Sequence, residues 1–323
     1  MKLRFPLLVL LAATLSAPAG ALAQKYPAKT VRLVLPFATG SAVDVLARIY
    51  GQKMSETWGQ QVLVDNRTGA SGIVGMEFIA RASPDGYTLG MGNVATLAIN
   101  PSLYAKLPYD VGRDYVPISY VAAIRNSLSV HPSLPVHSVK ALIALAKARP
   151  GELNYASGGV GSAQHVPMEM LKALAGINIV HISYKGLTPA FNEVLAGQVP
   201  MMVSGVVTAL PYHKTGRLRI IATTGATRTQ VTPEIPTIAE AGVRGYEFDS
   251  WTGFLAPTST PPGIVSQVHA EVARISNLPD VRERLTAAGF ELAGSSPEAF
   301  AAIIRDNNAR LGKVIRDAGI KAE

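Results

Sequence analysis

The sequence predicts an α/β protein of two lobes with a ligand cleft between them. The chain has 323 residues, more than a single hydrophobic core usually organises. Short apolar runs alternate with helical patterns along most of it, which is typical of parallel sheets covered by helices. Two extended apolar segments, 117–122 and 219–224, have the character of strands that cross from one lobe to the other. A cleft between two such lobes is a common place for a ligand.

The first 23 residues have the pattern of a secretory signal peptide. Lys2 and Arg4 give a positive start, and an apolar run follows at 7–15. Residues 21–23, Ala-Leu-Ala, supply the small-x-small pattern of a cleavage site. A membrane-spanning helix needs about 20 apolar residues, and prolines stand at both edges of this shorter run. We therefore expect residues 1–23 to be removed and the mature protein to lie outside the cytoplasm.

Lobe 1 is expected to hold both ends of the mature chain. Its predicted strands are residues 31–35, 62–65 and 87–91. Its predicted helices are residues 42–58, a second helix that ends near 82, and the amphipathic runs 264–275, 281–288 and 297–316. Together with the two crossings, this pattern assigns residues 24–121 and 225–323 to lobe 1.

Lobe 2 is expected from the middle of the chain, where the alternation resumes. Its predicted strands are residues 127–130, 154–156, 179–183, 201–203 and 218–222. Its predicted helices are residues 139–148, 165–175 and 189–196. Because strands again alternate with helices, a second sheet covered by helices is expected. Residues 122–224 therefore form lobe 2.

Composition narrows the possible functions. The chain has no cysteine, which removes disulfides, thiol nucleophiles and thiolate metal sites. Its formal net charge is +8, but the basic residues are scattered, so nucleic acid is not an expected partner. The 6 histidines show no metal-binding spacing, and no metal is expected. The run Gly90-x-Gly92-x-x-Ala95 spells a dinucleotide fingerprint, but it follows the third predicted strand without a suitably placed acid, so no cofactor is expected.

Three turns that follow strands are candidate anion sites, at residues 36–41, 157–162 and 184–186. In the first turn, Ser41 is a candidate helix N-cap, and Asp44 completes a pattern similar to a capping box. Unpaired N–H groups and the positive end of a helix favour an anion at such a turn. The alternative is an ordinary turn in which glycine supplies only backbone freedom. The two Gly/Ser turns lie in opposite lobes, which favours the ligand interpretation.

Ser162 and His165 leave an enzymatic alternative open, a hydrolase in which they act as nucleophile and base. The chain has no Gly-x-Ser-x-Gly motif, which the nucleophile elbow of many hydrolases requires. A serine at a helix start with a histidine one turn later is more often a cap and a polar group that faces a cleft. We therefore expect a binding protein and no catalytic activity.

A series of motifs along the mature chain resembles the Bug family, the periplasmic receptors of tripartite tricarboxylate transporters. The motifs include Tyr26-Pro-x-Lys29, Pro36-Phe-x-x-Gly40, Asp44-Val-Leu-Ala-Arg48, Val64-Asp-Asn-Arg67, Pro84-Asp-Gly-Tyr-Thr-Leu89, Leu153-Asn-Tyr-Ala-Ser157 and Pro236-Thr-Ile-Ala-Glu-Ala-Gly242. The resemblance implies a type II periplasmic-binding-protein fold, a small organic carboxylate as ligand, and the membrane subunits of the transporter as partners. We expect a periplasmic monomer that closes on its ligand by a hinge motion. A solute sensor that signals to a membrane protein remains an alternative.

The resemblance also implies which residues meet the ligand, mainly through backbone amides and water. In lobe 1 these are Phe37, Ala38, Thr39, Gly40 and Ser41, with Asn93 and Thr96 nearby. In lobe 2 they are Gly161, Ser162, His165 and Tyr184. Where the family commonly has an acid, this chain has Ser204. Because such an acid could hold the ammonium group of an amino acid, we expect a ligand without an amine.

Overall fold

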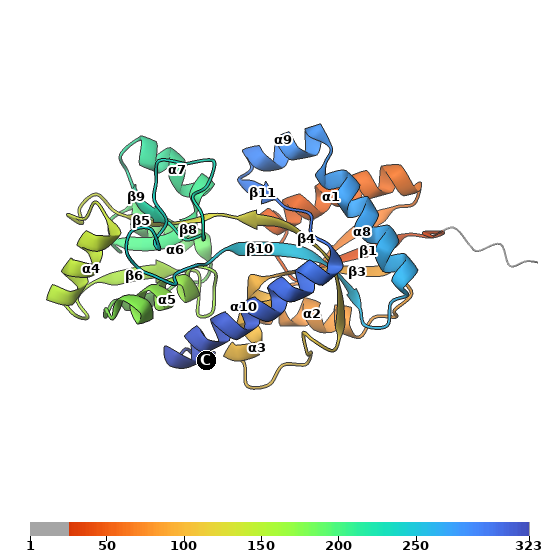
Figure 1. Cartoon of the computed structure of the whole chain (residues 1–323), viewed down its shortest axis with the longest axis horizontal. Coiled ribbons are helices and arrows are strands. Elements are labelled where there is room, and N and C mark those ends of the chain that lie inside the picture. Colours follow the sequence, from red (N-terminus) through yellow and green to blue (C-terminus); the bar gives the residue numbers. More distant parts are fainter. Residues whose placement is uncertain (1–25, 323) are drawn as a thin grey trace, which may run out of the picture.

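The computed structural model describes residues 26–322, so the expected signal peptide lies outside the described residues. Two α/β lobes lie side by side, and each has its own sheet (Figure 1). The two-lobed α/β architecture expected from the sequence is confirmed. Between residues 26 and 322, no helix combines the length and apolar character of a membrane span.

Lobe 1 is built on a 6-stranded sheet in the order β11-β4-β10-β3-β1-β2. Its strands are β1 (Val31–Leu35), β2 (Val62–Asn66), β3 (Thr88–Asn93), β4 (Tyr115–Ile124), β10 (Ser250–Pro257) and β11 (Phe290–Leu292). The helices are α1 (Ala42–Trp58), α2 (Ile73–Ala80), α3 (Asn100–Leu103), α8 (Pro262–Ser276), α9 (Pro279–Ala287) and α10 (Pro297–Asp317). β1 pairs in parallel with β2 and β3, whereas β10 runs antiparallel to β3 and β4. The parallel strands end at one edge of the sheet, where the loops to α1 and α3 begin.

Lobe 2 is built on a 5-stranded sheet in the order β7-β6-β8-β5-β9. Its strands are β5 (Asn126–Val130), β6 (Asn154–Ser157), β7 (Val180–Ser183), β8 (Met201–Gly205) and β9 (Arg219–Thr223). The helices are α4 (Val139–Ala148), α5 (His165–Ala175), α6 (Leu187–Leu195) and α7 (Val206–Lys214). β6 is parallel to β7 and β8, and β5 is antiparallel to β8 and β9. Each sheet is therefore mixed, because β10 in lobe 1 and β5 in lobe 2 run antiparallel to both of their neighbours.

The first connection between the lobes is short. β4 belongs to the first sheet over its whole length, and β5, in the second sheet, begins two residues after β4 ends. Only Arg125 stands between the two strands. We infer that the chain crosses at Arg125, slightly later than the expected boundary at 121.

The second connection is longer. β9 is in the second sheet and β10 is in the first. The segment between them packs on lobe 2: Thr237 forms a β-bridge with Thr223, and the Tyr246 hydroxyl donates to the Pro167 carbonyl at 3.0 Å. We infer that residues 225–248 go with lobe 2, although the sequence assigned them to lobe 1. The second crossing then lies near Asp249.

Candidate functional site

The first predicted loop, residues 36–41, joins β1 to α1 in lobe 1. Ser41 caps α1: its Oγ accepts the N–H of Asp44 at 3.2 Å. Gly40 has φ +80°, a left-handed conformation that glycine adopts without strain. Its N–H donates to Oδ2 of Asp44 at 2.9 Å. Ser41 and Asp44, which were predicted as a helix cap and its partner, therefore fix the end of this loop.

Asp44 is the anchor of the lobe 1 loop. It is only 2% exposed, and Arg48 donates to both of its oxygens, from Nε at 2.9 Å and from Nη2 at 3.0 Å. Asn66 donates to Oδ1 of Asp44 at 2.9 Å and to the carbonyl oxygen of Phe37 at 3.0 Å. Burial alone would raise the pKa of Asp44, but the hydrogen bonds from Arg48, Gly40 and Asn66 hold it below its usual value.

The middle of the same loop is left open. Ala38, Thr39 and Gly40 are exposed. Within residues 26–322, the N–H groups of Ala38, Thr39 and Ala42 donate no hydrogen bond. Unpaired N–H groups beside the N-terminus of a helix attract an anion. The loop can therefore bind a carboxylate without a positively charged side chain.

The second predicted loop, residues 157–162, joins β6 to α5 in lobe 2. Gly161 has φ +72°, and its N–H donates to Nδ1 of His165 at 3.0 Å. The hydroxyl oxygen of Ser162 accepts the backbone N–H of His165 at 3.2 Å. A Cβ atom on Gly161 would lie 2.2 Å from Cδ2 of Leu103, which belongs to lobe 1. The second loop is thus in direct contact with the opposite lobe.

His165 lies in a stack of rings behind this loop. The ring centroids of His165 and His181 are 4.0 Å apart, and those of His181 and Tyr155 are 5.0 Å apart. Nε2 of His181 lies 2.6 Å from the hydroxyl oxygen of Ser157, at the end of β6. Burial, with a smaller contribution from His181, lowers the pKa of His165 to about 4. His165 is therefore a neutral imidazole near neutral pH.

Glu169 and Lys172 lie beside the ring stack and contact each other. The Tyr155 hydroxyl and Lys172 Nζ both donate to Oε1 of Glu169, at 2.5 and 2.7 Å. The same oxygen lies 3.9 Å from Nε2 of His165. Glu169 and Lys172 neutralise each other, and the ring stack is left without net charge.

The contacts of Ser162 and His165 do not form a nucleophile–base pair. Ser162 bonds to the main chain of His165, and the imidazole nitrogen Nδ1 bonds to Gly161. Among the described residues, no hydrogen bond joins the Ser162 hydroxyl to the imidazole ring. A base that activates a serine must lie within hydrogen-bonding reach of its hydroxyl.

The other residues predicted to bind the ligand differ in how far they are buried. Asn93 and Thr96 cap each other at the end of β3, with Oδ1 accepting from the Thr96 N–H at 3.1 Å and Oγ1 accepting from the Asn93 N–H at 3.0 Å. Thr96 and Ser204 are both 0% exposed, so neither can touch a solute in this conformation. Tyr184 is half-buried, and its N–H donates to Ser157 at 3.0 Å.

A small cavity connects this region to the crossing strands. It has a volume of about 40 Å³ and is lined by Val43, Asn93, Ala122, Ile124, Ser250, Trp251 and Thr252. This volume holds about one water molecule. Larger hollows of about 530 and 550 Å³ lie on lobe 1 and include no residue of either Gly/Ser loop. The structure thus brings Asn93 next to the base of the lobe 1 loop but places Ser204 inside lobe 2.

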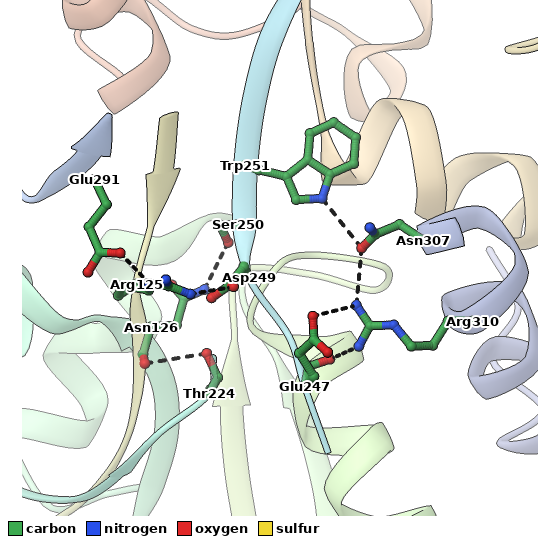
Figure 2. A network of polar contacts seen from close by, with 10 residues as sticks. All are labelled: Arg125, Asn126, Thr224, Glu247, Asp249, Ser250, Trp251, Glu291, Asn307 and Arg310. Atoms are coloured by element: carbon green, nitrogen blue, oxygen red, sulfur yellow. Dashed lines mark hydrogen bonds and ion pairs between the residues drawn. The ribbon is translucent and has the colours of Figure 1, made fainter. Parts of the chain in front are cut away.

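Arg125 joins the two crossings, a role that the sequence gave no reason to expect. It donates from Nη1 to Asp249 at 2.5 Å and from Nε to Glu291 at 2.6 Å (Figure 2). Asn126, the next residue, donates to the Ser250 hydroxyl at 2.9 Å. Burial raises the pKa of Asp249 despite the nearby arginine. One cation therefore ties both connecting segments and β11 together.

A second set of contacts fastens α10 of lobe 1 to the returning segment. Arg310 donates to the carbonyl oxygen of Glu247 and, from Nη2, to Oδ1 of Asn307 at 3.2 Å. The same Asn307 oxygen accepts from the Trp251 indole at 3.4 Å (Figure 2). Trp251 is buried and packs edge-on against Phe300. The lobes are thus held at their connection by polar contacts around a buried aromatic pair.

Comparison with known proteins agrees with this architecture. The tripartite tricarboxylate transporter family receptor matches residues 46–320. BugT of Bordetella pertussis is 33% identical over 310 residues, which cover 96% of this chain and 95% of BugT. The structure of Rpa4515 from R. palustris with adipate has a TM-score of 0.82 at 36% identity and covers 92% of this chain and 100% of that one. MatC from Rhodopseudomonas palustris with bound malate has a TM-score of 0.78 at 30% identity and covers 90% of this chain and 100% of that one.

The family match at residues 46–320 extends over both lobes and includes the lobe 2 loop at 157–162. The resemblance expected from the motifs is therefore confirmed, and so is the fold that it implied. The chain belongs to the Bug family, the receptors of tripartite tricarboxylate transporters.

Proposed function

We propose that the protein is a periplasmic receptor that captures a small carboxylate and delivers it to the membrane subunits of a tripartite tricarboxylate transporter. The observation that carries the proposal is the pair of Gly/Ser loops, one in each lobe, each just before a helix. In lobe 1 the N–H groups of Ala38 and Thr39, which have no partner among the described residues, lie in the loop that leads into α1. Neither loop contains a lysine or an arginine. Backbone N–H groups and helix ends would therefore supply the attraction for an anion.

Dicarboxylates are the favoured class of ligand. Rpa4515 carries adipate and MatC carries malate, and both proteins share the fold of this chain. Each of these acids has two carboxyl groups. Two anion-favouring loops in opposite lobes would suit such a ligand, because one end could bind each loop and the ligand would hold the lobes together.

The ligand is proposed to lack an amine. Ser204, which stands where an acid is common in the family, lies near the end of β8 as a buried neutral residue whose hydroxyl has no partner among the described residues. Nothing at this position would balance the charge of an ammonium group, and an unpaired charge in a closed cleft is strongly unfavourable.

The absence of catalysis is part of the proposal. A hydrolase that used Ser162 and His165 would need the imidazole beside the serine hydroxyl, but Nδ1 of His165 accepts from Gly161. The Ser162 hydroxyl in turn accepts the backbone N–H of His165. Both groups therefore shape the loop, which supports binding over turnover.

The test is a thermal-shift and calorimetric titration of the mature chain, residues 24–323, with adipate, malate, glutarate, glutamate and nicotinate. A ligand at about 100 times its Kd adds about 2.7 kcal/mol to the free energy of unfolding, which raises Tm by several degrees. Glutarate and glutamate form a matched pair because they differ only by the amine. We expect a shift with a dicarboxylate and a smaller one with glutamate. A folded protein that responds to none of the five acids would contradict the proposal, and a preference for glutamate would contradict the absence of an amine.

A further inference from the structure

The same five-residue pattern occurs once in each lobe. Residues 40–44 read Gly-Ser-Ala-Val-Asp, and residues 161–165 read Gly-Ser-Ala-Gln-His. In both, the glycine has a positive φ, and the serine oxygen accepts the N–H of the fifth residue at 3.2 Å. In both, the side chain of the fifth residue accepts the glycine N–H, at 2.9 Å in lobe 1 and 3.0 Å in lobe 2. The two loops share one hydrogen-bonding scheme.

The acceptor at the fifth position differs in charge. Asp44 is an anion balanced by Arg48, which donates to both of its oxygens. His165 has no such partner of its own, because Lys172 donates to Glu169. Since a backbone N–H can only donate, Nδ1 of His165 must present a lone pair to Gly161. The neutral ring then carries its proton on Nε2.

We propose that His165 is a positioning residue, whose neutral Nδ1 holds the Gly161 N–H and so sets the conformation of the lobe 2 loop, as Asp44 does for the lobe 1 loop. This inference rests on the proposed function and gives His165 a role in holding the loop, in place of the expected direct contact with the ligand. Gly161 packs against Leu103 of lobe 1. The conformation that His165 imposes is therefore the one in which the lobes meet.

The surroundings explain why the acceptor is neutral. The titratable and charged groups around the ring are His181 on β7, Tyr155 on β6, and Glu169 and Lys172 on α5. Glu169 is already 3.9 Å from Nε2 of His165. A second carboxylate here would repel Glu169 and an incoming carboxylate ligand. A protonated imidazole would lose its lone pair and release Gly161.

Three substitutions of His165 test separately whether the loop needs the acceptor and whether it needs the acceptor to be neutral. His165→Asn keeps an acceptor without charge, and Asn has the same shape as the Asp that accepts the glycine N–H in lobe 1. His165→Asp keeps the acceptor and adds charge, whereas His165→Leu removes the acceptor. The three variants are compared with the unchanged protein for folding by circular dichroism and then in two independent measurements.

The first measurement needs no ligand. In ¹⁵N NMR spectra at pH 7, we expect Nδ1 of His165 to be unprotonated and the Gly161 amide to be protected from hydrogen exchange. Gly161 should exchange about tenfold faster in the Leu variant and near the original rate in the Asn variant, which corresponds to one hydrogen bond. A proton on Nδ1, or equal protection of Gly161 in the Asn and Leu variants, would overturn the proposal.

The second measurement is the Kd for adipate and for malate at pH 7. We expect His165→Leu to weaken binding about tenfold, His165→Asn to stay within about threefold, and His165→Asp to be weaker than His165→Asn. Equal affinities in the Asn and Leu variants would overturn the positioning role, and equal affinities in the Asp and Asn variants would overturn the need for neutrality. If the unchanged protein binds neither acid, the proposed ligand class fails, but Gly161 exchange still decides the role of His165.

Discussion

The two Gly/Ser loops use the same backbone scheme but differ in what surrounds them. The lobe 1 loop is fixed by Asp44 within its own lobe, and its middle is exposed to solvent. The lobe 2 loop is fixed by a neutral histidine in a ring stack, and its glycine lies against Leu103 of the other lobe. The difference teaches that one loop presents donors to an anion, whereas the other also forms part of the contact that closes the cleft.

Substitution of Gly161 and of Gly40 tests this difference, and it should have the largest effect on ligand affinity. A Cβ atom on Gly161 would meet Leu103 at 2.2 Å, whereas a Cβ atom on Gly40 would meet nothing within 4 Å. Both have a positive φ, so alanine strains the two loops to a similar degree. We expect Gly161→Ala to weaken adipate binding about 100-fold and Gly40→Ala less than about tenfold, because only the former obstructs closure. Isothermal titration calorimetry measures both, and equal losses would show that the lobes do not meet at Gly161 when the ligand is bound.

The free energy of unfolding should depend on pH in different ranges for His165 and for Asp44, the two side chains that accept a glycine N–H. In the unfolded chain, His165 takes a proton near the ordinary histidine pKa of 6.5, whereas in the folded protein burial lowers its pKa to about 4. The unfolded state therefore binds more protons in this window, and the free energy of unfolding falls as the pH falls through it. His165 contributes a loss of roughly 2–3 kcal/mol. Urea denaturation at several pH values measures the slope, which should be shallower for His165→Asn.

Asp44 should act in a different pH window. Its pKa lies below the ordinary aspartate value of 3.8, so its stabilising effect is present above that value and is lost as the pH falls below it. A slope between pH 6.5 and 4 that His165→Asn leaves unchanged would contradict the assignment of this window to His165. His181, whose pKa is also lowered by burial, accounts for a slope that remains in the variant.

Asp44 should stabilise the lobe 1 loop through several hydrogen bonds at once. Asp44→Ala removes the partner of Arg48, Asn66 and the Gly40 N–H. We expect a loss of about 2 kcal/mol in the free energy of unfolding, since several hydrogen bonds to a charged group disappear together. The matched variant Asp44→Asn keeps an acceptor and should lose about half as much. Denaturant titration distinguishes them, and an Asn variant as unstable as the Ala variant would argue that the charge alone anchors the loop.

Local parts of this site could be predicted from the sequence, and distant parts could not. The strand 31–35, the helix 42–58 and the Ser41–Asp44 cap follow from patterns within a few residues, and the structure confirms them. The partners of Arg125 are 124 and 166 residues away, so no local pattern predicts that cluster. The burial of Thr96 and Ser204 likewise depends on how strands and helices pack together. The repeat of residues 40–44 at 161–165 is visible in the sequence, but its shared hydrogen bonds are not.

The two serines provide the finest test of the shared scheme. Ser41 and Ser162 each accept the N–H of the residue three positions later, at 3.2 Å in both lobes. Ser41 is the N-cap of α1, whereas the N-cap of α5 is Gln164 and Ser162 lies two residues before it. Replacing a serine that makes such a bond by alanine costs about 1 kcal/mol of stability, and we expect Ser41→Ala and Ser162→Ala to lose similar amounts. Affinity should differ even where stability does not, because only the Ser162 loop contacts the opposite lobe. Ser162→Ala should thus weaken adipate binding by about threefold more than Ser41→Ala. Equal affinities would mean that the Ser162 hydrogen bond shapes only the approach to α5, and that His165 holds Gly161 without help from its neighbour.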